Sequence, residues 1–77
     1  MAPPSQPQPA LGRAIRQLRE RQGTSQEALA HDAGVTTGTI SSIERGQSNP
    51  TWATVEAIAK ALGVSMGKLA SLVEKQN

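Results

Sequence analysis

The side chains that could carry out chemistry are few in this sequence, and their spacing does not suggest catalysis. The chain has one histidine, His31, and no cysteine, so a metal site built on thiolates or paired imidazoles is not expected. The hydroxyls of Thr39, Ser41 and Ser42 have no base at a spacing that would activate them, and the carboxylates stand singly. We therefore expect no enzyme, no metal, no cofactor and no small-molecule ligand, and the remaining chemistry of these side chains is hydrogen bonding.

Two short predicted helices joined by a tight turn position the polar side chains between residues 25 and 46. Leu29 lies on the inner face of the first helix, and Gly34 follows where the chain has to turn sharply. Thr36 suits the N-cap of the second helix, whose inward positions are taken by Ile40 and Ile43. The outward positions of this second helix are Thr37, Gly38, Thr39 and Ser42. Two helices arranged in this way form a helix-turn-helix, in which the second helix enters the major groove of DNA.

Three more helices complete the predicted fold. Apolar residues recur with the helical period over residues 10–22, 52–62 and 66–75, between glycine and proline stops. Thr51 and Ser65 precede the last two of these segments and suit their N-caps. The sequence therefore predicts an all-α fold, a compact bundle of five helices without strands.

The sequence also bears on one helix start and on the only aromatic side chain. The helix that begins near residue 25 has two candidate caps, Ser25 and Thr24, because Thr24 also starts a Thr-x-x-Glu capping box with Glu27. The pattern does not choose between them. Trp52 is the only aromatic residue and stands one turn before Val55, so we expect it to pack in the core.

The stretch SQEALAHDAGVTTGTISSIERG resembles the helix-turn-helix of the Cro/repressor family, the small bacterial and phage regulators often called XRE-like. The motif positions that carry this resemblance are Gln26, Leu29, Ala30, Gly34, Val35, Ile40, Glu44, Arg45 and Gly46. The flanking LRERQG and KALGVS match the same family, so the resemblance covers about Leu11 to Val73. It implies a lambda-repressor-like fold and binding to double-stranded DNA. The length resembles that of restriction–modification controller proteins and small phage-type repressors.

Matching positions in the family imply which residues bind DNA. The helix that starts near Thr36 would read base edges, Gln26 would hold a phosphate, and Arg45 would contact the flanking backbone. Relatives often have longer side chains at Thr37 and Gly38, so part of the specificity is expected from DNA shape or from Gln26 or Arg45. The implied positions are Gln26, Thr36, Thr37, Gly38, Thr39, Ser42, Arg45, Gln47 and Asn49. The resemblance thus implies a sequence-specific transcriptional regulator, a repressor or an autoregulator, on a palindromic operator.

Arg19 and Glu44 are charged residues at inward-leaning positions of two different helices. Each lies one turn past an isoleucine of an apolar stripe, Ile15 and Ile40, where a charge needs a partner. Matching Arg and Glu residues pair in the family, so the resemblance implies a structural ion pair between Arg19 and Glu44.

The last predicted helix has more apolar surface than one neighbouring helix can cover. Its apolar residues span a wide arc, and exposed apolar surface of this kind marks an interaction site. Because two-fold symmetry is the commonest closure, we expect a homodimer with Leu69, Leu72 and Val73 at its interface.

Charge and composition set the remaining expectations. The formal net charge is +2, and four arginines fall within residues 10–22, where they form either a phosphate-contacting cluster or a solvated face. Residues 1–9, MAPPSQPQP, have four prolines and no charge, which predicts a disordered Pro/Gln-rich arm before a DNA-binding domain at residues 10–77. No apolar run reaches ~18 residues and no secretory signal is apparent, so we expect no membrane association and a cytoplasmic location.

A protein-interaction module, coactivator-like or antitoxin-like, is the alternative to a DNA-binding regulator. The short outward side chains and the low net charge favour this alternative, whereas the clustered arginines and the intact turn favour DNA. Steep salt dependence of binding to duplex DNA would distinguish the two functions.

Overall fold

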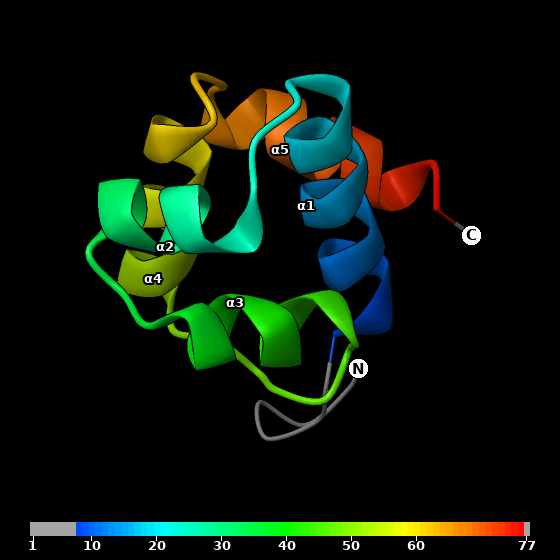
Figure 1. Ribbon diagram of the computed structural model, residues 1–77. Helices are drawn as coiled ribbons and strands as arrows, with labels where there is room; N and C mark the ends of the chain where they lie inside the picture. The colour runs from blue at the N-terminus through cyan, green and yellow to red at the C-terminus, as the bar shows by residue number, and fades with distance from the viewer. Residues whose placement is uncertain (1–7, 77) are drawn as a thin grey trace.

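The computed structural model describes residues 8–76, which contain five α-helices and no strand. The helices are α1 (Pro9–Arg21), α2 (Gln26–Ala33), α3 (Thr37–Glu44), α4 (Trp52–Ala61) and α5 (Met66–Glu74) (Figure 1). The predicted all-α fold is therefore confirmed. Three helices end one residue earlier than expected because Gln22, Leu62 and Lys75 are their C-cap residues. Within residues 8–76, no helix is long and apolar enough to cross a membrane.

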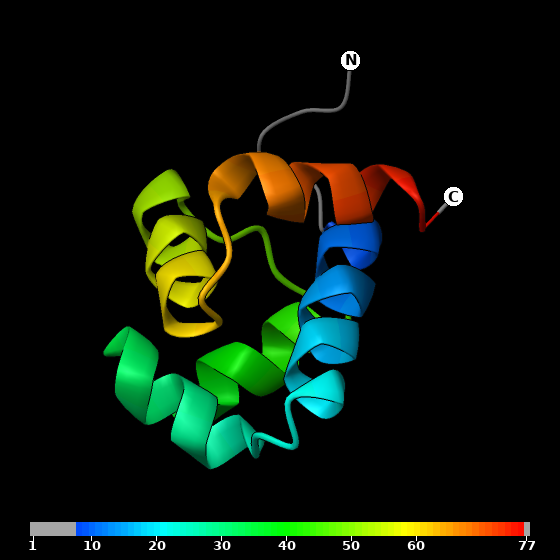
Figure 2. The ribbon, with the colours of Figure 1, turned by 90° about the horizontal axis from the view of Figure 1, so that it is seen from above.

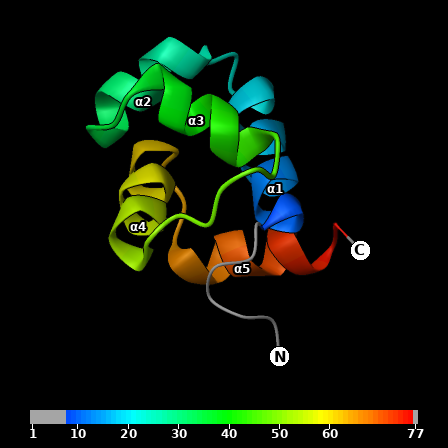
Figure 3. The ribbon, with the colours of Figure 1, turned by 90° about the horizontal axis from the view of Figure 1, so that it is seen from below.

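The five helices surround one apolar core. Helices α1 and α4 form two sides of the bundle, α5 runs along a third, and α2 and α3 close the side opposite α5 (Figures 2 and 3). Every helix contributes at least one large side chain that is fully buried, and these are Ile15, Leu29, Ile40, Ile43, Ile58 and Leu69. Burial of such side chains is the dominant stabilising term in a domain of this size.

Four helices begin with the same capping interaction. The side-chain oxygen of the N-cap residue accepts a hydrogen bond, 3.0 to 3.2 Å long, from the backbone N–H three residues later. The caps are Ser25, Thr36, Thr51 and Ser65. Each such cap contributes about 1 kcal/mol by satisfying one free N–H group of the first turn. Ser25, rather than Thr24, therefore begins α2.

The boundary expected between an arm and a domain needs correction. Residues 1–7 lie outside the described residues, so the expectation of a disordered arm is not addressed there. Pro9, expected to belong to the arm, is the first residue of α1, a position where its fixed φ suits a helix. Gly46 has a φ of 70° and lies so close to Pro9 that an added Cβ would be 2.9 Å from the proline Cα.

The expectation that Trp52 packs in the core is wrong. Trp52 is 70% exposed and is the large hydrophobic side chain that stands out on the surface of the described chain. The helical period places it on the same side of α4 as Val55, but it is the first residue of the helix. The core beside it is filled by Val55 and Ile58, which lie further along α4.

Candidate nucleic-acid interface

The turn between α2 and α3 fixes how the two helices cross. Gly34 adopts φ 73° and ψ 30°, the left-handed region in which a residue with a Cβ is strained. The N–H of Gly34 donates to the carbonyl of His31 at 3.2 Å, and the N–H of Val35 donates to that of Ala30 at 2.9 Å. These bonds satisfy the last carbonyls of α2 while the chain reverses, so α3 starts in a defined direction.

Helix α3 is divided into a buried face and an open face. Ile40 is fully buried, whereas Thr37 and Gly38 are exposed at the amino end of the helix. Helix α3 itself runs across the side of the molecule seen in Figure 3. The hydroxyls of Thr36 and Thr39 are 2.9 Å apart and hydrogen-bond to each other, which holds them at the start of this face. No other helix covers the exposed amino half of α3 in the described chain.

A buried ion pair locks α3 against α1. The Arg19 Nε and Nη2 atoms donate to the two carboxylate oxygens of Glu44 at 2.7 and 3.0 Å. The Glu44 side chain is only 2% exposed and that of Arg19 13%. Arg19 Nη1 also donates to the carbonyl of Thr24 at 2.9 Å, so this arginine ties together α1, the start of α2 and the end of α3. The hydrogen bond with Glu44 raises the pKa of Arg19.

Gln26 joins the same network, which the sequence did not reveal. Its Nε2 donates to Glu44 Oε1 at 3.0 Å, so the carboxylate accepts three hydrogen bonds from two other helices. Gln26 was expected to hold a phosphate with its side chain and backbone N–H. One of the two N–H groups of its amide nitrogen is bound to Glu44, and a contact with phosphate therefore has to use its backbone N–H or the second N–H of the amide. The main role of the Gln26 side chain in this structure is therefore to link α2 to α3 through its hydrogen bond to Glu44.

The segment after α3 contains the other expected contact residues. Arg45 Nε donates to Gln47 Oε1 at 3.1 Å, and Arg45 Nη1 donates to Ser41 Oγ. Arg45 and Gln47 thus present one exposed, connected group at the carboxyl end of α3. Asn49 is also exposed, but it lies on the rim of a groove between α4 and α5. The open side of α3 therefore brings together Thr36, Thr37, Gly38, Thr39, Ser42, Arg45 and Gln47.

The arginines of α1 do not form an open cluster for phosphate. Arg13 Nη2 donates to the carbonyl of Gln76 at 3.3 Å, and Arg16 pairs with Glu20 at 3.2 Å on the exposed side of the helix. Arg19 is buried against Glu44. Three of the four arginines thus have partners within the chain, which favours the solvated-face interpretation for α1.

The structure also shows where the residues expected at a dimer interface lie and whether acidic or histidine side chains are grouped. Leu69 was expected at a dimer interface, but it is 2% exposed and belongs to the core of a single chain, so this expectation is corrected. Leu72 and Val73 are only partly buried. Within residues 8–76, no three His, Cys, Asp or Glu residues are grouped so as to hold a metal ion.

The ion pair leads to a stability prediction. Arg19→Met should cost about 3–5 kcal/mol because it leaves the Glu44 carboxylate buried without its partner, and Glu44→Leu in that background should recover much of the loss. The exposed pair Arg16 and Glu20, with side chains 61% and 55% exposed, is the matched control and should couple by under about 0.5 kcal/mol. Double-mutant cycles from urea unfolding measure both pairs. Equal coupling energies would show that Arg19 and Glu44 act as ordinary surface charges.

Comparison with known proteins agrees with this geometry. A helix-turn-helix family model matches residues 15–69, a range that runs from α1 into α5 and includes the whole α2–turn–α3 unit. The chain belongs to this helix-turn-helix family. The resemblance to the Cro/repressor regulators is thereby confirmed, and the family is one of DNA-binding domains rather than of enzymes.

Similar proteins include regulators of known structure. The competence pilus inhibition repressor of Acinetobacter baylyi is 36% identical over 67 residues, which are 87% of this chain and 61% of the repressor. The chain thus spans less than two thirds of that relative. The clp gene regulator ClgR of Corynebacterium glutamicum superimposes with a TM-score of 0.85 at 28% identity, over 88% of this chain and 72% of that one. The restriction–modification controller C.Esp1396I, solved as a tetramer with its natural 35 base-pair operator, gives 0.83 at 31% identity, over 88% and 90%.

Proposed function

We propose that this protein is a transcriptional regulator that binds double-stranded DNA by placing α3 in the major groove. The observation that carries the proposal is the open amino half of α3, held rigidly by the Gly34 turn and by the buried Arg19–Glu44 pair. A helix presented in this way can read base edges with its first residues. The controller protein bound to its operator supports the same use of the fold. A cytoplasmic location, beside the DNA, belongs to this proposal.

The proposal includes a two-fold dimer on a palindromic site, acting as a repressor or an autoregulator. Two copies related by a two-fold axis would place their α3 helices in successive major grooves, ~34 Å apart. A domain of this size has little buried surface of its own, and association would stabilise it by mass action. Selection of bound duplexes from random DNA should therefore return an inverted repeat with half-sites one helical turn apart. A selection that returns no common sequence would contradict the proposal.

Substitutions should distinguish the residues that contact DNA phosphates from those that contact base edges. Arg45→Ala should weaken binding to every sequence and flatten the slope of log K against log salt by about 1.8 in a dimer, because each lost phosphate contact contributes ~0.9. Thr37→Ala should instead cost about 1 kcal/mol at particular base pairs and leave the slope unchanged. Fluorescence anisotropy on a selected and a scrambled duplex, at two salt concentrations, measures both.

Lys60→Ala is the control for this experiment, since Lys60 is exposed in the last turn of α4, away from the loop that follows α3. It removes the same charge and should leave the slope unchanged. If Lys60→Ala and Arg45→Ala flatten the slope equally, Arg45 makes no specific phosphate contact.

A protein-interaction module remains the second candidate because the open side of α3 is poor in positive charge. Arg45 is the positively charged residue on this side of α3, and its guanidinium already donates hydrogen bonds to Ser41 and Gln47. A surface of short hydroxyl side chains could equally meet a protein partner. Duplex binding that is weak and independent of salt would favour this second function.

A further inference from the structure

Arg45 is an exposed residue whose charged side chain is held by two neutral neighbours. Its Nη1 donates to the hydroxyl of Ser41, and its Nε donates to Oε1 of Gln47 at 3.1 Å. Neither acceptor carries a charge, so the guanidinium keeps its full positive charge. A guanidinium has five N–H groups, and because two of them are used here, three remain for an acceptor outside the chain. Arg45 is thus oriented and still able to bind an anion.

The carboxylate nearest to Arg45 in the sequence is not available to neutralise it. Glu44 precedes Arg45, but its side chain is 2% exposed and accepts hydrogen bonds from Arg19 and Gln26 inside the domain. Within residues 8–76, the ion pairs join other residues, and no carboxylate pairs with Arg45. The buried pair therefore has a second consequence, since it leaves the exposed arginine beside it charged.

The backbone fixes the residues that hold Arg45. The N–H of Arg45 donates to the carbonyl of Ser41 at 3.0 Å, so the same serine binds this arginine through its backbone and its hydroxyl. The N–H of Gln47 donates to the carbonyl of Ser42 at 3.0 Å, across the left-handed turn at Gly46. Both acceptors are therefore anchored to the last turn of α3, and the orientation of the guanidinium follows that of the helix.

We propose that Ser41 and Gln47 are positioning residues for a phosphate contact of Arg45, and we call these three residues the Arg45 clasp. This inference rests on the proposed function, and it gives Gln47 a role other than the expected direct contact with DNA. A free arginine side chain loses rotamers when it binds a phosphate, and this loss weakens binding. The clasp removes much of the loss because the side chain is already held. Ser41, which was not among the expected contact residues, then acts on DNA only through Arg45.

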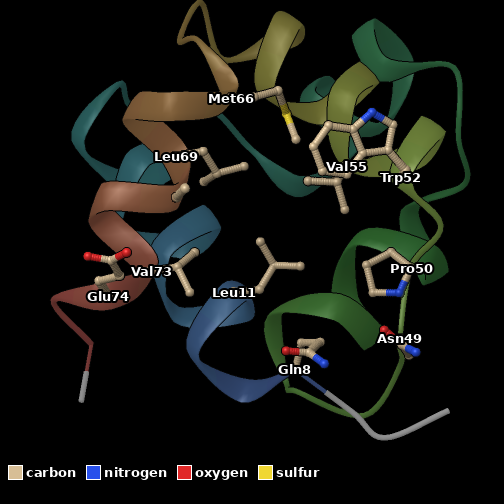
Figure 4. Close-up of a pocket in the computed structure, with 11 residues that line it drawn as sticks. Gln8, Leu11, Asn49, Pro50, Trp52, Val55, Met66, Leu69, Val73 and Glu74 are labelled. Atoms are coloured by element: carbon tan, nitrogen blue, oxygen red, sulfur yellow. The ribbon is translucent and has the colours of Figure 1, made fainter. Parts of the chain in front are cut away.

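The Arg45 clasp lies outside the groove between α4 and α5. Asn49 and Pro50, further along the same loop, form part of the wall of this groove, whereas Ser41, Arg45 and Gln47 do not line it (Figure 4). Substitutions in the clasp therefore leave the groove unchanged. A change in DNA binding then reports on the contact with DNA rather than on that face of the molecule.

Double-mutant cycles on a selected duplex test the clasp. Ser41→Ala and Gln47→Ala should each weaken binding by about 2- to 10-fold per subunit, the effect of having to immobilise one long side chain. The slope of log K against log salt should not change, because Arg45 still meets its phosphate. In the Arg45→Ala background, both substitutions should have no effect. Ser41→Thr keeps the hydroxyl and should bind like the wild type, and Ser71→Ala is the control for the same substitution at an exposed site on α5.

A measurement without DNA separates this inference from the proposed function. The NMR order parameter of the Arg45 Nε–H group should be high in the wild type, in contrast to that of Arg21, which is also exposed. It should fall in Ser41→Ala, because one of the two bonds that hold the guanidinium is lost. If the order parameters behave in this way while no protein binds duplex DNA, the clasp stands and the proposed function fails.

Three results would overturn the clasp. The first is an Arg45 Nε–H group as mobile in the wild type as that of Arg21. The second is a Ser41→Ala protein that binds the duplex like the wild type, or that is weakened equally with and without Arg45, since Ser41 would then act by another route. The third is an equal effect of Gln47→Ala in the two backgrounds, which would show that Gln47 contacts DNA itself.

Discussion

Gly12→Ala should destabilise the fold more than any other single methyl group added to this chain. Gly12 is buried in α1 where this helix crosses the end of α3. A Cβ at this position would run into the carbonyl oxygen of Ile43 and lie 3.0 Å from that of Glu44. Both neighbours are backbone atoms at the end of a packed helix, so neither can rotate away. The helices would have to separate, and the Arg19–Glu44 pair lies at the same crossing.

We expect Gly12→Ala to cost about 3 kcal/mol, the upper part of the usual range for overpacking, which is a large fraction of the stability of a small domain. Gly67→Ala is the matched control, because Gly67 is also helical and its added Cβ would meet only Ser65 Oγ at 3.9 Å. It should be stabilising by about 0.5–1 kcal/mol through the usual preference of helices for alanine. Urea unfolding followed by circular dichroism compares the two. Equal free energies of unfolding would show that α1 and α3 are not in close contact at Gly12.

Gly38→Glu should produce the largest effect on binding while leaving the fold intact. Gly38 is exposed, and a Cβ there would have Thr36 Oγ1 at 3.8 Å as its near neighbour, an ordinary contact. Gly38 is the second residue of α3, where a glutamate interacts favourably with the helix dipole. Stability should therefore be unchanged or slightly higher. On DNA, the same side chain would bring a negative charge and added bulk to the bases and phosphates, and it should cost about 3 kcal/mol, or more than ~100-fold in affinity.

The parts of the fold that local chemistry determines could be predicted from the sequence. The caps at Thr36, Thr51 and Ser65 and the left-handed turn at Gly34 depend on residues within one turn of each other. The five helices follow from their apolar period for the same reason. The charged residue Arg19 could be paired with Glu44 only through the family resemblance, because no local rule connects positions 25 residues apart.

The features that were missed depend on which helix ends lie beside each other. Periodicity places Trp52 on the inner side of α4. It does not reveal that the apolar core stops short of the first residue of this helix, which leaves Trp52 exposed. Leu69 and Val73 lie on one helix, and only the packing decides that the first is buried and the second lines a groove. Gly12 did carry a signal, since a glycine inside a helix is unfavourable and suggests a close approach of backbone. Gln26 gave no comparable sign of its bond to Glu44.

Whether the amino half of α3 is the surface that meets DNA can be measured directly by the fluorescence anisotropy of a selected duplex titrated with three proteins. The proteins are the wild type, Gly38→Glu and Ser71→Glu, the last of which lowers the net charge equally at an exposed site on α5. We expect all three proteins to unfold with similar stability, the wild type and Ser71→Glu to bind alike, and Gly38→Glu to lose more than ~100-fold in affinity. A folded Gly38→Glu protein that binds the duplex as tightly as the wild type would show that the amino half of α3 does not meet DNA.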